Sequence, residues 1–325
     1  MQARPIVLGL VLTLGLTLLL GGCATPQASY DSYLQGELAA GRGDMNQALA
    51  ELSQAIATNP KLTLAFMARG RIYKTQGQYA RAAEDFQQAT TLEPNNFDAF
   101  YQLGLMYQYL RRFSESIAAY QQAVQIRPLD PDTNMNLAIV YTQTGQPLRG
   151  LSYAQRAVSG ASESPHTHGN LGILYAALGY QDKAIEELRK AIELNANAPE
   201  VYLNLASEYM KQDKWQVARN VLQGAERLGP NAAVRERMGL TYYKTNDLAQ
   251  ALASYRGALE VDARYTPALN GLGVVLMTQA LQSDPPDVAK AREAVDTWKK
   301  SLAIDASQPA ILRLVERYGG QFAKP

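Results

Sequence analysis

The stretch Asn170–Tyr175 reads "NLGILY", and it decides the fold because it recurs at a fixed interval. Looser copies read "NLAIVY" at 136–141 and "NLASEY" at 204–209, so the three copies are evenly spaced along the chain. A recurrence of this kind indicates one small structural unit that is repeated along the chain. A chain of 325 residues is then expected to be an array of such units or two domains, because one compact core rarely holds so many residues.

Small residues recur in the same register along most of the chain. Glycine or alanine returns at the interval of these copies, with one step shorter by a single position, and a second small-residue series lies twelve positions further on. Two small positions per unit let two antiparallel helices approach closely, while tyrosine, leucine and phenylalanine fill the space between successive pairs. The first series consists of Gly36, Gly70, Gly104, Ala138, Gly172, Ala206, Gly239 and Gly273.

This spacing resembles the signature of the tetratricopeptide repeat (TPR) family, in which one unit takes about 34 residues. The resemblance covers nearly all of the chain after residue 28. It implies an all-α fold: a right-handed superhelix, or α-solenoid, of about eight helix-turn-helix repeats over residues 29–308. A C-terminal capping helix and tail are expected over residues 309–325. The repeats are expected to begin near residues 29, 63, 97, 131, 165, 199, 232 and 266.

Two repeats depart from the pattern. In the fourth, Pro147, Gly150 and Gly160 are expected to interrupt the second helix, because proline and glycine disfavour a helix interior. This predicts a locally soft solenoid around residues 147–165. The eighth repeat contains nine extra residues, and Asp284 is the expected N-cap of its second helix.

Residues 1–22 predict an export signal, since a basic start is followed by an uncharged apolar run and by small residues. "LGGC", ending at Cys23, resembles the lipobox of bacterial lipoproteins, in which the cysteine is acylated. The resemblance implies a membrane anchor at Cys23, a lipidated tether over residues 23–28, and a place on the periplasmic face of the outer membrane. A short membrane anchor and plain secretion remain the alternatives.

Composition excludes several classes of function. Without residues 1–22, the chain has 30 basic and 30 acidic side chains, which argues against binding of nucleic acid. The single cysteine excludes an intramolecular disulfide and a thiolate metal cluster. His166 and His168 lie two positions apart on a predicted helix, so packing or groove lining is expected rather than a shared metal. No catalytic motif and no cofactor motif is present, so the sequence predicts a non-enzyme without a cofactor.

The family resemblance also implies a concave groove lined by fixed positions of each first helix. Asparagine occupies the sixth position in three consecutive repeats. A primary amide donates and accepts, as a peptide group does. In the O-GlcNAc transferase branch of the family such a ladder holds the backbone of an extended peptide, whereas the alternative is that asparagine is simply common at this position. The expected groove residues are Asn136, Asn170, Asn204, Gln102, Tyr101, Leu105, Tyr109, Met135, Ile139, Ile173 and Met210.

The sequence therefore predicts a lipid-anchored scaffold that binds envelope proteins or peptide segments. Lipoproteins of this architecture serve pilus and secretin assembly, exopolysaccharide export or peptidoglycan enzymes, and no motif selects among these. The alternative is a polysaccharide-binding module with Tyr101, Tyr109 and Tyr243 as stacking platforms. The oligomeric state is left open.

Overall fold

A computed structural model of the protein describes residues 26–195 and 197–322. This part of the chain consists of 17 α-helices and contains no strand, so the all-α prediction is confirmed. The predicted export signal, Cys23 and residues 24 and 25 lie outside the described residues, as do residues 323–325.

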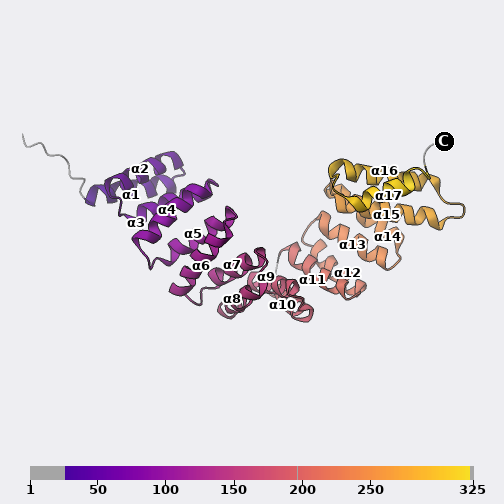
Figure 1. Ribbon diagram of the computed structural model, residues 1–325, viewed down its shortest axis with the longest axis horizontal. Coiled ribbons are helices and arrows are strands. Elements are labelled where there is room, and N and C mark those ends of the chain that lie inside the picture. The colour runs from indigo at the N-terminus through magenta and orange to yellow at the C-terminus, as the bar shows by residue number, and fades with distance from the viewer. Residues whose placement is uncertain (1–25, 196, 323–325) are drawn as a thin grey trace, which may run out of the picture. The chain divides into compact units, whose positions relative to one another are not determined.

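The chain divides into two compact units, Met1–Arg111 and Arg112–Pro325, of which the first contains α1 to α5. Inside each unit the helices follow one another as antiparallel pairs, while α5 and α6 belong to different units (Figure 1). The first helices of the pairs are α1 (Pro26–Gly41), α3 (Thr63–Thr75), α5 (Phe97–Tyr109), α7 (Pro131–Gln143), α9 (Pro165–Ala177), α11 (Pro199–Lys211), α13 (Ala232–Lys244) and α15 (Thr266–Gln282). The second helices are α2 (Met45–Thr58), α4 (Tyr79–Leu92), α6 (Phe113–Ile126), α8 (Pro147–Gly160), α10 (Gln181–Glu193), α12 (Trp215–Glu226), α14 (Leu248–Val261) and α16 (Val288–Ile304), and α17 (Pro309–Gly319) follows.

The small-residue series lies where the two helices of a pair touch. A Cβ atom built on Gly172 would lie 2.7 Å from Cγ of Leu188, which is fully buried in α10. The same relation joins Gly36 to Leu52, where the corresponding distance is also 2.7 Å. A small residue on the first helix therefore faces a large residue sixteen positions later on the second, and this pairing recurs because the repeat recurs.

Local chemistry sets the helix boundaries. Asp130 accepts a hydrogen bond from the backbone N–H of Thr133 at 2.8 Å, which caps the start of α7. Proline occupies the first turn of α7, α8, α9 and α11, where its missing N–H is not needed. The turn inside each of the first seven pairs contains one residue with positive φ, the conformation that glycine adopts most easily. These residues are Gly43, Gly77, Arg111, Gly145, Gly179, Asp213 and Asn246.

Helix α1 begins at Pro26, three positions before the repeat start that was expected near residue 29. Two sequence expectations were wrong. Helix α8 runs uninterrupted from Pro147 to Gly160, since the proline stands at its start. Helix α16 is capped by Asp287 and not by Asp284, because the Asp287 carboxylate accepts from the N–H of Lys290 at 3.0 Å.

The two glycines of α8 have a packing role. A Cβ atom on Gly150 would lie 2.8 Å from the carbonyl oxygen of Ala138, and one on Gly160 would lie 2.9 Å from that of Leu129. Each glycine therefore permits a close approach between the second helix and the backbone beside it, instead of ending the helix.

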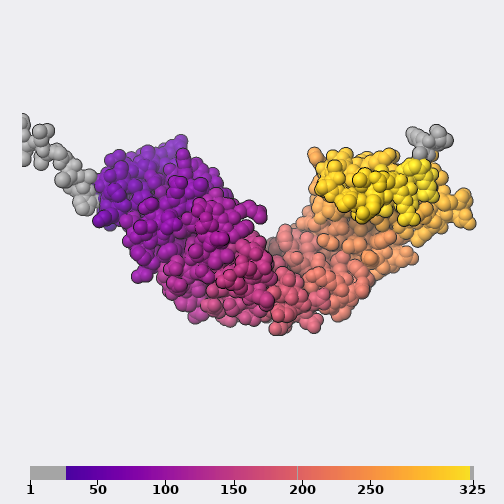
Figure 2. Space-filling view, in the orientation of Figure 1, coloured from indigo at the N-terminus to yellow at the C-terminus, as the bar shows by residue number. Residues whose placement is uncertain are grey.

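The last helix caps the second unit. Ile311 of α17 is buried in the same core cluster as Trp298 of α16, while Arg313, Glu316 and Arg317 are exposed to solvent. Figure 2 shows the yellow atoms of this end of the chain on the outside of the second unit. One apolar and one charged face suit a helix that ends a stack of repeats. Within residues 26–195 and 197–322, no helix is long and apolar enough to cross a bilayer.

Candidate functional site

The sixth residues of three neighbouring first helices form a row of amides. Asn136 of α7, Asn170 of α9 and Asn204 of α11 are all half-buried. Helix α9 contacts both α7 and α11, so the three amides lie on adjacent helices of the second unit. We call these three residues the asparagine row. In the first unit Gln102 of α5 holds the same position and accepts a hydrogen bond from Nζ of Lys74 at 2.9 Å.

Two pockets open beside this row, both in the second unit. The α7–α9 pocket has a volume of about 220 Å³ and is lined by Met135 and Ile139 of α7 together with Asn170 and Ile173 of α9. The α9–α11 pocket has a volume of about 450 Å³, and Asn170, Ile173 and Asn204 line it. Because Asn170 and Ile173 belong to both, the pockets adjoin along α9. Apolar walls with amides beside them suit an extended peptide.

The amides of the row differ in what they can offer a ligand. Nδ2 of Asn170 donates to Nε2 of His166 at 3.1 Å, which leaves Oδ1 of Asn170 as an acceptor for a ligand. Asn204 has no hydrogen-bond partner in the described part of the chain, so both its donor and its acceptor are available. Asn170 and Asn204 can therefore each accept from a backbone N–H group and each donate to a carbonyl oxygen, Asn170 with the second hydrogen of its amide.

The other predicted groove residues differ in how much of their side chain is exposed. Ile173 is 39% exposed and Ile139 is half-buried, so both present apolar surface at the pockets. Met135 is only 2% exposed, yet it lines the α7–α9 pocket. Met210 is 9% exposed and belongs to the core cluster that also contains Val234 of α13. Met210 therefore packs the interior and leaves little surface for a ligand.

The tyrosines suggested as sugar platforms are used for packing. Tyr109 of α5 stacks on Tyr79 of α4, with ring centroids 4.6 Å apart and an interplanar angle of 14°. Tyr101 stacks on Phe97 of the same helix at 6.1 Å. Tyr243 packs against the core of the last repeats. Leu105, also of α5, is half-buried. The stacked ring faces are shared with the protein, which does not favour a row of open sugar platforms.

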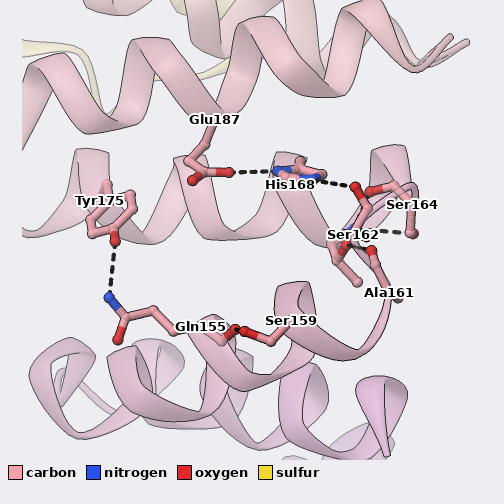
Figure 3. Close-up of polar contacts among 9 residues, drawn as sticks. Gln155, Ser159, Ala161, Ser162, Ser164, His168, Tyr175 and Glu187 are labelled. Carbon is pink, nitrogen blue, oxygen red and sulfur yellow. Dashed lines mark hydrogen bonds and ion pairs between the residues drawn. The ribbon is translucent and has the colours of Figure 1, made fainter.

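A second set of amides, which the sequence analysis missed, belongs to the framework. Nε2 of Gln155 in α8 donates to the hydroxyl of Tyr175 in α9 at 3.1 Å (Figure 3). The same contact joins Gln121 to Tyr141 at 3.0 Å, and the hydroxyl of Tyr107 donates to Gln87 at 3.2 Å. The three glutamines recur at the repeat interval, and this periodicity is the signal that could have revealed them. They tie α4, α6 and α8 to the first helix that follows each of them.

The two histidines have separate surroundings. His168 is 7% exposed, and its Nδ1 lies 2.6 Å from Oε2 of Glu187 while its Nε2 lies 2.9 Å from the carbonyl oxygen of Ser162 (Figure 3). His166 instead lines the α9–α11 pocket. His168 is therefore packed and His166 lines a pocket, and the sequence analysis, which expected packing or groove lining, did not say which histidine does which. Among residues 26–195 and 197–322, no group of three potential metal ligands lies together.

The next first helix differs from this site in its charge. Glu236, the fifth residue of α13, is 9% exposed, and burial raises the pKa of its carboxyl group. Oε2 of Glu236 lies 3.6 Å from Nε of Arg237, and this positive charge opposes the rise. Burial also raises the pKa of the Tyr255 hydroxyl, with a further contribution from Glu236. The charged group of α13 is therefore buried, whereas the acidic residue Glu200 of α11 is exposed.

Comparisons with known families agree with the geometry. Residues 70–110 and 172–213 match a TPR repeat family, and residues 97–130 match a tetratricopeptide repeat family. Residues 203–266 and 236–310 match a further tetratricopeptide repeat family. The chain carries tetratricopeptide repeats. TPR domains bind peptide or protein partners and are generally non-catalytic scaffolds, so a role in protein–protein interaction follows in these general terms.

Solved structures share the fold of this TPR chain. A tetratricopeptide repeat protein from Parabacteroides merdae has a TM-score of 0.59 and 14% identity, over 77% of this chain and 99% of that one. The C-terminal part of a TPR repeat-containing protein from Cytophaga hutchinsonii gives 0.60 and 17%, over 76% and 98%. The Cut9–Hcn1 hetero-tetramer of APC/C gives 0.59 and 16%, over 85% and 54%. A search of curated proteins found no match.

Proposed function

We propose that this TPR chain is a non-catalytic, lipid-anchored scaffold that holds an extended segment of a partner protein for assembly in the bacterial cell envelope. The partner's backbone lies along the asparagine row, and its side chains enter the two adjoining pockets. Assembly of a pilus or secretin, export of an exopolysaccharide and positioning of a peptidoglycan enzyme are the envelope processes that such a scaffold serves.

The observation that carries this proposal is the shared lining of the two pockets. Asn170 and Ile173 border both, so the two pockets lie side by side along α9, where one extended ligand can reach both. Successive residues of an extended chain lie about 3.3 Å apart, which lets alternate side chains reach successive pockets along neighbouring helices. Amides beside apolar pockets give backbone recognition together with side-chain selection.

The anchor is the second part of the proposal. Helix α1 begins at Pro26, three positions after Cys23, and three residues reach at most about 11 Å. An acylated Cys23 would therefore hold the first repeat at the membrane surface. Leu34 and Leu38 of α1 are 54% and 56% exposed, while Ile72 at the place of Leu38 in α3 is 6% exposed. The exposed leucines give this first helix apolar surface close to the anchor.

The polysaccharide alternative receives less support. It requires open aromatic faces, whereas Tyr101 is stacked on Phe97 and Tyr109 on Tyr79. Tyr109 is still 54% exposed, but one exposed ring does not make the row of stacking platforms that the alternative needs.

The anchor is tested by mass spectrometry of the protein from its native membrane. Cys23 is expected to be the N-terminal residue and to carry acyl chains, and Cys23→Ser should give an unprocessed, unacylated precursor. An unmodified Cys23 in the wild type would refute the anchor. The scaffold is tested by affinity capture from crosslinked, detergent-solubilised envelopes followed by mass spectrometry. A reproducible protein partner supports the scaffold, and specific recovery of glycan alone would overturn it.

A further inference from the structure

The α9–α11 pocket is lined by a glycine at the fifth position of α9. The fifth residues of the neighbouring first helices are Met135 in α7 and Leu203 in α11, whereas α9 has Gly169. Gly169 lines the pocket, so a side chain of similar size at this position would occupy space that is now open. The repeat pattern is thus broken at one place, and the break produces a cavity.

Neither the backbone nor the packing requires this glycine. Gly169 lies inside α9 and is not among the residues with positive φ. A Cβ atom on Gly169 would meet its nearest neighbour, Cγ2 of Val201, at 3.5 Å, which is an ordinary contact. Gly172 in the same helix is different, because its Cβ would lie 2.7 Å from Leu188. Glycine inside a helix is destabilising relative to alanine. A glycine that destabilises a helix without a packing reason indicates a role for the space it leaves.

The lining of the pocket specifies what fits there. Ile173 and Val201 give it aliphatic walls, and Asn170 and Asn204 stand beside them. Nδ2 of Asn170 donates to Nε2 of His166, and Oδ1 of Asn170 remains able to accept a hydrogen bond from a ligand. Glu200 is the one lining residue with a full formal charge among the described residues, and no lysine or arginine lines the pocket. Aliphatic walls that lead to carboxylate and amide oxygens match a side chain with an apolar stem and a cationic end.

Acidic residues also stand at or just before the starts of α7, α9 and α11, and of these Glu200 lines the pocket. Asp132 and Glu200 are the second residues of α7 and α11, and Glu163 lies in the turn before α9. All three are exposed, and none forms an ion pair within residues 26–195 and 197–322. Acidic residues at helix starts also stabilise the helix dipole, so these three contribute to the fold whether or not a ligand is bound. Their combined field nevertheless favours a positively charged ligand.

We propose that the α9–α11 pocket binds an arginine or lysine side chain of the partner segment, with its stem against Ile173 and Val201 and its cationic group at Glu200 and the asparagine oxygens. This proposal rests on the proposed peptide-binding function, which it deepens by naming a residue class that the site selects. The segment that binds this scaffold is therefore basic at the position that meets α9 and α11.

The test uses the full chain and three short acetylated, amidated peptides of serine, alanine and glycine that differ only at a central arginine, leucine or glutamate. Binding is measured by fluorescence anisotropy. The arginine peptide is expected to bind at least about tenfold more tightly than the other two. Gly169→Leu, which supplies the side chain that α11 carries at this position, should abolish that preference. Gly169→Ala, which adds a single carbon atom, should reduce the preference less than Gly169→Leu does. Glu200→Gln should weaken the arginine peptide by about two- to fivefold.

Each other outcome would overturn the assignment. Preference for the leucine peptide would make the pocket an apolar subsite, and equal binding of all three would show that it selects no side chain. Unchanged arginine binding by a folded Gly169→Leu protein would place the basic side chain elsewhere, and no measurable binding would remove the subsite. Circular dichroism of each variant establishes that it is folded. Capture of an envelope partner by Gly169→Leu at wild-type strength would reject this subsite alone. The scaffold role is tested separately, by replacing the three asparagines of the row with alanine and measuring capture of the partner.

Discussion

Helices α7, α9 and α11 share their framework with α13 and α15 but differ from them at the sixth position. All five carry glycine or alanine as the eighth residue, the position that touches the second helix. The sixth residue is asparagine in the first three, Arg237 in α13 and Gly271 in α15. At Gly271 a Cβ atom would overlap the ring of Tyr255, so that position is closed by packing. A side chain that the fold required would not vary in this way, which separates the asparagine row from the framework.

The largest expected effect belongs to the framework. Gly172→Leu should destabilise the protein by about 1–3 kcal/mol or more, because even a Cβ at this position lies 2.7 Å from Leu188. The damage should be confined to neighbouring repeats, since each repeat contacts only its neighbours. Thermal unfolding measures the loss. Asn170→Ala, two positions earlier in the same helix, is the control and should stay within about 0.5 kcal/mol of the wild type. Equal stability of the two variants would contradict the assignment of Gly172 to the framework and of Asn170 to a position that the fold does not need.

The next effect concerns the charge in α13. Burial raises the pKa of Glu236, so folding favours the protonated carboxyl and the wild type loses stability as pH rises through the folded-state pKa. Glu236→Gln keeps a neutral group at all pH values. We expect it to melt at a higher temperature than the wild type at pH 7 and to lose this advantage below about pH 4, where carboxyl groups are protonated in both states.

Glu200→Gln provides the comparison for Glu236, because Glu200 is exposed. Because a carboxylate in the first turn of α11 complements the helix dipole, Glu200→Gln should melt slightly below the wild type at pH 7, the opposite sign to Glu236→Gln, and should match it at low pH. If Glu236→Gln is less stable than the wild type at pH 7, the contact of the Glu236 carboxylate with Arg237 stabilises the protein by more than the burial of that carboxylate costs. The expected effect of the buried charge in α13 would then have the wrong sign.

The smallest expected effect is an increase in stability. Gly169→Ala should stabilise α9 by about 0.5–1 kcal/mol, because the added Cβ fits at 3.5 Å and the helix loses a flexible residue. Gly172→Ala should do the opposite. Differential scanning calorimetry of the two single variants separates a glycine retained for space from a glycine retained for close packing. A loss of stability in Gly169→Ala would show that this glycine, too, belongs to the framework.

The periodic part of the structure could be predicted from the sequence, because equivalent positions of the repeats make the same packing contacts. Helices α3, α5 and α7 begin at Thr63, Phe97 and Pro131, the positions that the repeat register indicates. The errors concern residues whose role depends on a particular neighbour. The continuity of α8 depends on Gly150 meeting the backbone of Ala138, and Met210 lies in a core cluster shared with α13.

The site was predictable in part for the same reason. The asparagine row lies on adjacent first helices, and Asn170 and Asn204 border a pocket as residues of one repeated position should. The α9–α11 pocket was not predictable, because Gly169 looks like any other glycine until Val201 and Ile173 are seen around it. The framework role of Gln155 was missed because its partner, Tyr175, lies on the next helix pair.

The central claim is that the asparagine row binds a partner and does not hold the fold together. It is tested most directly by comparing the wild type with the triple variant Asn136→Ala, Asn170→Ala and Asn204→Ala, measuring thermal unfolding and capture from crosslinked envelopes on the same preparations. Three amide hydrogen bonds at about 0.5–1.5 kcal/mol each predict at least a tenfold loss of captured partner, with a melting temperature close to that of the wild type. Undiminished capture by the folded triple variant, or a collapse of its stability, would contradict the claim.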